Sequence, residues 1–413
     1  MPRVRRSVHD REILRLALPA LGALAAEPTY LLVDTAIVGH LGTRQLAALA
    51  LAATVLGALV ALCNFLAYGT TAQVARLHGA GEQQRAGQLA AQALWLALAI
   101  GVALALACLA FAHPIMDVVG GGGEAADDAA RYLRLSAAGL PCALLALAGQ
   151  GFLRGIGDLR TPLVILVAAN VANVVLEVVL VYGLGLGLDG SALGTVAAQL
   201  GMGAAFAVLL LRAPASSRRP VGALLWRLGS MGGDLVIRTG SLLAAFTLAG
   251  AVLARTGEDA LAAHQIAFQL FLFIALVLDA VAIAGQVIVG RMLGAGDADA
   301  AWAAARRMVV WSLVVGVAFT GLLAALARVL PRAFSSDPAV LDRAAELWPL
   351  FALLIPPGAV VFALDGILIG GGHALHRPSP CSPSSRSRWR RWPSTGASSA
   401  CGPRSTCSWP LGC

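Results

Sequence analysis

The chain has 413 residues, of which 58% are hydrophobic and 13% are charged, and its mean hydropathy is +0.79. A soluble globular protein is closer to half apolar and a quarter charged, so this composition excludes an ordinary soluble protein. Apolar stretches of about 20 residues, the length that an α-helix needs to cross a bilayer, recur along the whole chain. The short alternating segments of a transmembrane β-barrel do not occur. The sequence therefore predicts an all-α polytopic membrane protein.

The net charge of +8 does not indicate a nucleic-acid-binding protein, because the charge is unevenly distributed. All 30 basic residues are arginine, and six of them lie in residues 377–413, which leaves residues 1–376 with a net charge of only +2. The other arginines cluster in short loops, which is a signal of membrane topology. We expect membrane lipids as partners, and neither a nucleic acid nor an obligate protein partner.

Ten hydrophobic spans follow one another along the chain. They are residues 12–38, 46–75, 88–112, 131–154, 162–183, 188–211, 229–254, 260–290, 303–327 and 344–370. The first span lacks the short apolar core and cleavage site of a signal peptide, so we expect it to be retained as an anchor. Arginine precedes this span and recurs in every second loop, including Arg154 and Arg160. This pattern predicts a multi-pass protein of the cytoplasmic (inner) membrane with its N-terminus in the cytoplasm, although Arg328, Arg332 and Arg343 run against it.

The chain also contains an internal repeat at a fixed offset of 215 residues. Residues 75–86 (ARLHGAGEQQRA) align without a gap with residues 290–301 (GRMLGAGDADAA). In the same register, residues 151–157 (GFLRGIG) align with residues 366–372 (GILIGGG). Six spans separate equivalent points, so both copies enter the membrane in the same direction, as in a parallel repeat. The repeat predicts an N-terminal lobe of six spans (1–213) and an incomplete C-terminal lobe of four (214–372).

The repeat stops at residue 373. Residues 373–413 contain ten Ser, six Arg, four Cys and three Trp, and six arginines could not be placed in hydrocarbon at an acceptable cost. One interpretation is a disordered basic tail that contacts anionic lipid. The other is an out-of-frame translation of the coding sequence of an eleventh and a twelfth span. Basic residues that are all arginine indicate a GC-rich gene. Such a gene, read in a shifted frame, gives a sequence rich in Ser, Arg, Pro, Cys and Trp, and this favours the second interpretation.

Asp34 is the first candidate functional residue. It lies within the first span, with apolar neighbours on both sides and no arginine one turn away. Charged residues inside spans are costly and are functional candidates by default. A carboxyl group buried there could take up and release a proton, and we favour this role over one in helix packing alone. Glu27 lies one heptad earlier, nearer the cytoplasmic end of the span, and its role stays open.

A stripe of polar residues lies on the fifth span. Asn170, Asn173 and Glu177 have the spacing i, i+3 and i+7, which places them on one face of a helix. In the sixth span, Thr195 and Gln199 have the spacing i, i+4. Such stripes either hold helices together or line a polar pocket, and the presence of a glutamate favours the pocket.

The second half of the chain has charged residues in comparable positions. Asp279 and Asp365 lie in the middle of their spans, and Arg238 in the seventh span could pair with either of them. These residues could be structural ion pairs or substrate contacts. P-loop, Rossmann and nucleophile-elbow patterns are absent from suitable settings, and the histidines lack metal-ligand spacing. The sequence thus predicts no enzyme, no cofactor and no metal-ligand cluster.

Four segments, in this order along the chain, resemble the multidrug and toxic compound extrusion (MATE) transporters, and most closely the DinF-like branch. They are EPTYLLVDTAIVGHLGTRQLAALALA (27–52), FLRGIGDLRTP (152–162), NVVLEVVLVYGLGLGLDGSALGTVAAQ (173–199) and ALVLDAVAIAGQVIVGRMLGAGD (275–297). The resemblance implies twelve helices in two six-helix lobes. It also implies an exchange of protons or sodium ions for amphipathic, often cationic compounds.

The resemblance implies roles for individual residues. Asp34 corresponds to the first-helix acid that this branch links to proton coupling. Asn173 and Thr195 correspond to the fifth-helix Asn and the sixth-helix Thr of the same cluster, while Glu177 stands where the family more often has Asp. A coupling proton, or alternatively a sodium ion, is therefore expected near these four residues. Asp279, together with Asp365, matches the common acids of the second lobe.

We therefore expect a cation-coupled, proton-driven antiporter that exports amphipathic drugs or toxins across the cytoplasmic membrane. One alternative is a flippase for a lipid-linked precursor on a related scaffold. Such a protein would need a cavity rich in arginine, whereas this sequence places only Arg238 deep in a span. The other alternative is a truncated product that does not transport.

Overall fold

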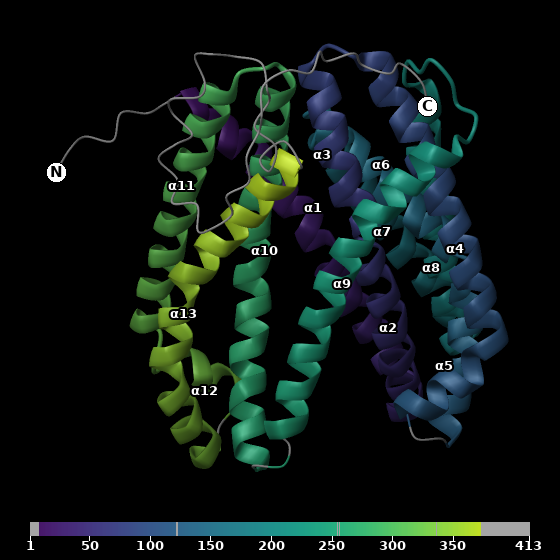
Figure 1. The fold of residues 1–413 in the computed structure, drawn as a ribbon. Helices are drawn as coiled ribbons and strands as arrows, with labels where there is room; N and C mark the ends of the chain where they lie inside the picture. Colours follow the sequence, from purple (N-terminus) through teal and green to yellow (C-terminus); the bar gives the residue numbers. More distant parts are fainter. Residues whose placement is uncertain (1–7, 121–122, 254, 256, 336, 373–413) are drawn as a thin grey trace, which may run out of the picture. The chain divides into compact units, whose positions relative to one another are not determined.

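The structure, a computed structural model, describes residues 8–120, 123–253, 255, 257–335 and 337–372. The helices, drawn in Figure 1, are α1 (Val8–Gly39), α2 (Thr43–Cys63), α3 (Phe65–Gly79), α4 (Gln83–Gly120), α5 (Glu124–Ala137), α6 (Leu140–Gly155), α7 (Arg160–Glu177), the π-helix η1 (Val178–Gly183), α8 (Gly187–Arg212), α9 (Gly222–Leu253), α10 (Glu258–Gly294), α11 (Ala298–Ala325), α12 (Leu330–Phe334) and α13 (Pro338–Gly371). The described residues form no β-strand, which confirms the predicted all-α class.

Each of the ten predicted spans corresponds to a helix or to a pair of helices. Among the described residues, nine spans are long and apolar enough to cross a membrane, and the pair α5 and α6, bent by 54°, makes a tenth. The second predicted span is broken at Asn64, where α2 ends and α3 begins. No charged or loop-like stretch interrupts the sequence at either break, so neither break was predicted. The short helix α12 was not predicted either.

The long helices carry prolines that weaken their backbone hydrogen bonding. In α4, Phe111 leaves the helical region (φ −115°, ψ 17°) three residues before Pro114. A proline inside a helix removes one hydrogen bond and clashes with the carbonyl group four residues earlier, which accounts for this kink. Helix α1 contains both Pro19 and Pro28 within one continuous helix. These two positions are therefore the points at which α1 can bend at the lowest cost.

The internal repeat is present in the packing of the helices. Helices α3 and α10 cross so closely that a Cβ atom on Gly79 would lie 2.0 Å from the carbonyl oxygen of Arg291. In the reciprocal contact, a Cβ atom on Gly294 would lie 2.0 Å from the carbonyl oxygen of Arg76. Gly79 and Gly294 are 215 residues apart, and so are Arg76 and Arg291. Each half thus presents the same surface to the other, as two copies do around a two-fold axis.

Contacts within each half repeat at the same offset. A Cβ atom on Gly151 would lie 2.6 Å from the carbonyl oxygen of Ala67, and one on Gly366 would lie 2.2 Å from that of Ala282. Both residues of the first pair are 215 positions before those of the second. The packing of α6 on α3 is therefore reproduced by that of α13 on α10, which confirms the predicted repeat in three dimensions.

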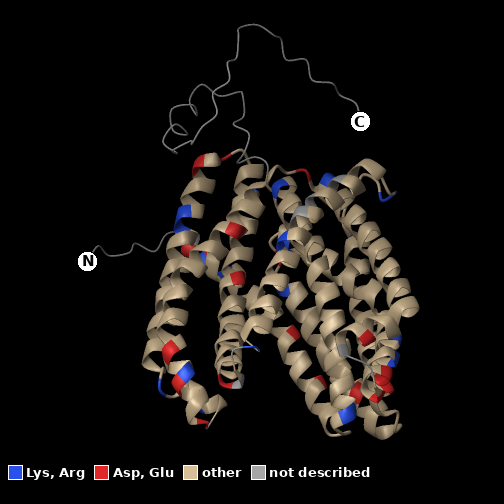
Figure 2. Cartoon of the chain, turned by 60° about the horizontal axis from the view of Figure 1, so that its bottom comes forward, with Lys and Arg blue, Asp and Glu red and all other residues tan. Residues whose placement is uncertain are grey.

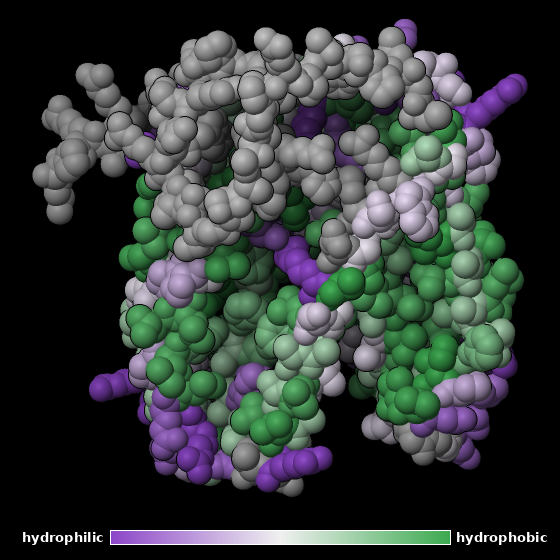
Figure 3. Space-filling model, in the orientation of Figure 1, coloured by the Kyte–Doolittle hydropathy of each residue, from purple (hydrophilic) through white to green (hydrophobic). Residues whose placement is uncertain are grey.

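The surface agrees with a membrane environment. Many of the acidic and basic residues lie toward the two ends of the helices, with a few in the middle, and most of the helix length carries neither (Figure 2). Hydrophobic residues cover the sides of the helices in the space-filling view (Figure 3). Helix α9 has no buried residue in its most apolar stretch, unlike the other spans. The tail whose origin was left open, residues 373–413, lies outside the described residues.

The reciprocal glycine contacts generate a prediction about stability. Gly79→Ala and Gly294→Ala should each destabilise the protein by about 1–3 kcal/mol, because the added methyl group overlaps a backbone oxygen that cannot move freely. Gly57→Ala is the control, since a Cβ atom on Gly57, also in a helix, would meet nothing within 4 Å. Thermal unfolding of the purified protein in detergent measures all three. Equal melting temperatures for the three variants would show that the helices do not cross as closely as described.

Candidate functional site

Asp34 lies in the penultimate turn of α1, where its side chain is only 2% exposed. Its Oδ1 atom accepts a hydrogen bond of 2.7 Å from the Oγ atom of Ser191, which is fully buried at the start of α8. A buried carboxyl group without partners would be strongly destabilising, so the serine hydroxyl supplies part of what water would otherwise provide. The structure thus places the acid of the first span directly against the sixth span.

The polar stripe of α7 faces the same point. Asn173 and Glu177 are 2% and 0% exposed, respectively. The Nδ2 atom of Asn173 donates to the Oγ1 atom of Thr195 at 3.4 Å, and this hydroxyl donates to Oε1 of Glu177 at 3.4 Å. The hydroxyl groups of Tyr30 and Thr195 are 2.9 Å apart. Asp34, Asn173, Glu177 and Thr195, the four residues predicted to form the coupling site, therefore lie together in one buried cluster.

Small residues bring α8 close to α7 and to the π-helix η1 around this cluster. A Cβ atom on Gly194 would lie 3.0 Å from the Cγ atom of Glu177, and one on Gly190 would lie 2.8 Å from the carbonyl carbon of Leu180. Directly after Glu177 the helix widens into the π-helix η1. Such segments inside α-helices are frequent at functional sites, where they change the register of the side chains. Glu177 thus lies at the junction of α7 and η1, with a glycine of α8 packed against its side chain.

Two oxygen atoms in the cluster have no hydrogen-bond partner among the described residues. They are Oδ1 of Asn173 and Oε2 of Glu177. A buried acceptor without a donor is costly. A proton can be taken up by the carboxylate oxygen of Glu177, whereas the amide oxygen of Asn173 can accept a hydrogen bond from a protonated neighbour or bind a cation. Oxygen atoms are also the ligands that hard cations such as sodium prefer over nitrogen or sulfur. The residues present therefore fit either coupling ion, H⁺ or Na⁺.

The remaining polar residues of the N-terminal half lie around the cluster and not within it. The Nδ2 atom of Asn170 donates to the backbone oxygen of Ala26 at 2.8 Å, which ties α7 to α1. Gln199 is half-buried, one turn beyond Thr195, and its Oε1 atom has no partner among the described residues. Glu27 is exposed on α1. None of these three makes a hydrogen bond to the four clustered residues in the described structure.

The charged residues of the second half form a separate group. Arg238 on α9 pairs with Asp365 on α13 at 3.0 Å, so the structure selects Asp365 as its partner. Asp279 on α10 instead accepts a hydrogen bond of 2.9 Å from the hydroxyl group of Tyr68 on α3. This bond joins the two halves of the chain. These acids are therefore engaged by protein groups, whereas the cluster around Asp34 retains unsatisfied oxygens.

Arg154 was misassigned from the sequence. It was counted among the loop arginines, but it lies in the last turn of α6, is only 6% exposed and donates to Oε1 of Gln150 at 2.8 Å. A count of basic residues cannot separate a loop arginine from one that is buried at the end of a helix. Ser191 and Tyr30 were also missed. Ser191 precedes Thr195 by four residues, a spacing that could have placed it on the same face.

Known proteins resemble this chain over most of its length. Residues 19–179 and 241–375 match the sequence profile of the MatE family. DNA damage-inducible protein F of Escherichia coli is 30% identical over 383 residues, which cover 88% of this chain and 81% of that protein. A probable multidrug resistance protein NorM of Bradyrhizobium diazoefficiens is 32% identical over 385 residues, which cover 88% and 80% of the two chains.

Solved structures share the fold. An outward-facing multidrug resistance MATE transporter of the MOP superfamily superimposes with a TM-score of 0.79 at 21% identity, over 90% of this chain and 84% of that one. A MOP superfamily transporter from Pyrococcus furiosus gives a TM-score of 0.78 at 23% identity, over 88% and 84% of the two chains. The profile match, the relatives and the fold agree with one another. The chain is a multi-pass membrane protein that belongs to the MATE family of multidrug efflux transporters, with relatives in its DinF-like branch.

Proposed function

We propose that this chain is a cation-coupled antiporter, driven by protons, that exports amphipathic and often cationic compounds across the cytoplasmic membrane. The observation that carries the proposal is the buried cluster of Asp34, Asn173, Glu177 and Thr195, with its two unsatisfied acceptor oxygens. The multidrug resistance proteins among its relatives support the substrate class. The arginine pattern of the loops supports a cytoplasmic N-terminus.

The proposed coupling step is a change of charge on Asp34. A proton on this carboxyl group removes its negative charge and changes its contact with Ser191. The serine hydroxyl donates a hydrogen bond to the charged carboxylate, and it can accept one from the protonated carboxyl group. The contact joins α1 to α8, so protonation changes how firmly the second half of α1 is held against the N-terminal lobe. Two arrangements of α1 that differ in proton affinity are sufficient for the proton to shift the equilibrium between them.

Coupling to the substrate follows from linkage. If a bound proton disfavours the arrangement that binds substrate, then a bound substrate must lower the affinity for the proton by the same factor. A cationic substrate adds charge repulsion of the same sign. Sodium could replace the proton in this scheme, because the oxygen atoms of Asn173 and Glu177 suit it as ligands.

Asp34→Asn is expected to abolish transport that is driven by a pH gradient. The amide is close in shape to a protonated carboxyl group but cannot exchange a proton. In proteoliposomes, ethidium accumulation driven by the pH gradient should fall at least tenfold, to the level of protein-free vesicles. The same vesicles with a sodium gradient at equal pH test which ion is coupled, since proton coupling predicts no accumulation there.

Asp117→Asn is the matched control for this experiment, because Asp117 is an exposed acid near the end of α4, outside the cluster. It should transport at the rate of the unmodified chain. Wild-type accumulation by Asp34→Asn, with the protein correctly inserted, would exclude Asp34 as the coupling residue. An unmodified chain that does not transport ethidium under either gradient would refute the proposed function.

Ser191→Ala tests the hydroxyl group beside Asp34. The hydrogen bond from Ser191 favours the charged carboxylate, so its loss favours the protonated form. Transport should therefore continue, with the pH of half-maximal rate displaced upward, because without this hydrogen bond the carboxyl group keeps its proton up to a higher pH. Initial rates measured between pH 5 and 9 would show the displacement. A profile that stays in place or moves downward would mean that this hydrogen bond has no part in coupling.

A further inference from the structure

Two ion pairs between described residues join the N-terminal half to the C-terminal half, and both begin in the first turns of α1. Asp10 accepts hydrogen bonds of 2.6 and 2.8 Å from Nε and Nη2 of Arg307 on α11, and its Oδ1 atom accepts a third, of 2.8 Å, from Nε1 of Trp311. Glu12 pairs with Arg291 on α10. We call these five residues the interlobe clasp. A bidentate arginine–carboxylate contact is among the strongest and most directional ion pairs.

The clasp is more protected from water than a surface ion pair. The side chains of Asp10 and Arg307 are 10% and 23% exposed, and those of Glu12 and Arg291 are 29% and 35% exposed. Exposed ion pairs contribute little, whereas removing one partner of a shielded pair leaves an uncompensated charge and is costly. The clasp can therefore contribute to the balance between two arrangements of the halves.

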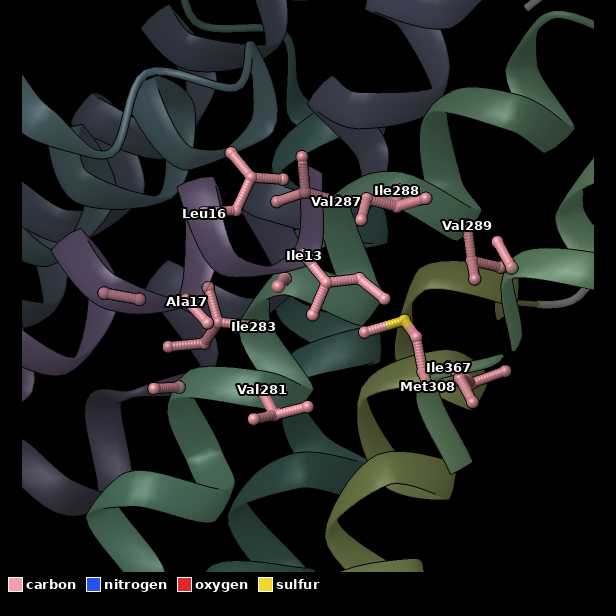
Figure 4. Packing of buried hydrophobic residues seen from close by; sticks show 14 of the residues in the cluster. Ile13, Leu16, Ala17, Val281, Ile283, Val287, Ile288, Val289, Met308 and Ile367 are labelled. Atoms are coloured by element: carbon pink, nitrogen blue, oxygen red, sulfur yellow. The ribbon is translucent and has the colours of Figure 1, made fainter. Parts of the chain in front are cut away.

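Apolar packing continues the same contact along α1. Ile13, Leu16 and Ala17 of α1 belong to a buried cluster with residues of the other half (Figure 4). Their partners there are Val281, Ile283, Val287 and Ile288 of α10, Met308 of α11 and Ile367 of α13. The first half of α1 is thus packed into the C-terminal lobe. Its second half carries Asp34 into the N-terminal lobe, with Pro19 and Pro28 between the two ends.

The clasp lies at one end of the molecule. Arg291 is also the residue whose carbonyl oxygen meets Gly79 at the close crossing of α3 and α10. At the opposite end, ion pairs lie within one half, as for Arg44 with Glu124 and Arg343 with Asp259. The space-filling view shows a notch at that end, between the α9–α10 connection and the ends of α2 and α5 (Figure 3). Ionic contact between the halves is therefore concentrated at the end that carries the start of α1.

We propose that Asp10 and Glu12, with Arg291, Arg307 and Trp311, hold the transport pathway closed at the end where α1 begins, and that they must separate before the pathway opens there. These residues act by position and need not contact the substrate. The proposal rests on the proposed function only in requiring that the two halves alternate between two arrangements. Asp34 lies on the same helix, so a bend of α1 at Pro28 could transmit its protonation to the clasp.

The test measures distances between the halves, without substrate or ion gradient. Nitroxide labels are attached to cysteines introduced at Gln84 and Asp299, two exposed positions that are 215 residues apart, one in each half. The seven native cysteines are replaced beforehand. A second pair, at Thr43 and Asp337, reports on the opposite end. Double electron–electron resonance then gives the populations of short and long distances at each end.

Asp10→Asn and Glu12→Gln should move the population toward a longer Gln84–Asp299 distance and a shorter Thr43–Asp337 distance. We expect the ratio of the two populations to change about tenfold or more for Asp10→Asn. Trp311→Phe removes one donor and keeps an aromatic ring, so a smaller change in the same direction is expected. Glu124→Gln, which breaks an ion pair within one half, is the matched control and should leave both distances unchanged.

A double variant that swaps the two charges, Asp10→Arg with Arg307→Asp, keeps the proposal testable if Asp10→Asn does not fold. We call it the exchange. It restores opposite charges and should keep the short Gln84–Asp299 distance, whereas Arg307→Asp alone should lengthen it. Unchanged distances in Asp10→Asn and Trp311→Phe, or equal distances in the exchange and in Arg307→Asp alone, would overturn the clasp. Because no gradient is applied, these results do not depend on whether Asp34 couples transport to protons.

Discussion

A carboxyl group inside a membrane-spanning helix must find polar partners within the protein, because the surrounding hydrocarbon offers none. Asp34 meets this requirement through Ser191 at the start of α8. The arrangement of α1, α7 and α8 follows from it: small residues let α8 approach Glu177, and Asn173 and Thr195 complete the polar surroundings. A buried site that holds the carboxyl groups of Asp34 and Glu177 responds to their charge, which is the property that ion coupling needs.

The helix packing is repeated in the two halves of the chain, but the acidic residues of α1 are not. The crossing of α3 and α10 and the packing of α6 and α13 are reproduced at an offset of 215 residues. At the same offset, however, Asp34 corresponds to Ala249, and Glu27 corresponds to Leu242. The duplicated fold therefore carries the acid in one lobe only. Helix α1 then links this single site to the other lobe, because its first turns pack into the C-terminal half.

Much of the fold could be predicted from the sequence, since hydropathy and the gapless repeat identify the spans and their direction. The cluster around Asp34 could be predicted in part, because Asn173 and Glu177 share a helical face and because the resemblance places Asp34 beside them. Ser191 lies inside the sixth predicted span, four residues before Thr195, and was missed because a single uncharged serine does not stand out in an apolar helix. The contacts of Asp10 and Glu12 could not be predicted, because periodicity does not reveal which distant helix a side chain meets. The breaks at Asn64 and between α5 and α6 were not predicted either, because no charged or loop-like stretch marks them.

The central claim is that substrate and proton are bound antagonistically through Asp34. The most direct measurement is the release of protons when a cationic compound binds to the purified protein in weakly buffered detergent solution. Addition of ethidium, followed with a pH indicator, is predicted to release up to about one proton per bound cation from the unmodified chain, and none from Asp34→Asn. Saturable binding of ethidium to the unmodified chain without proton release between pH 5 and 9 would contradict the account.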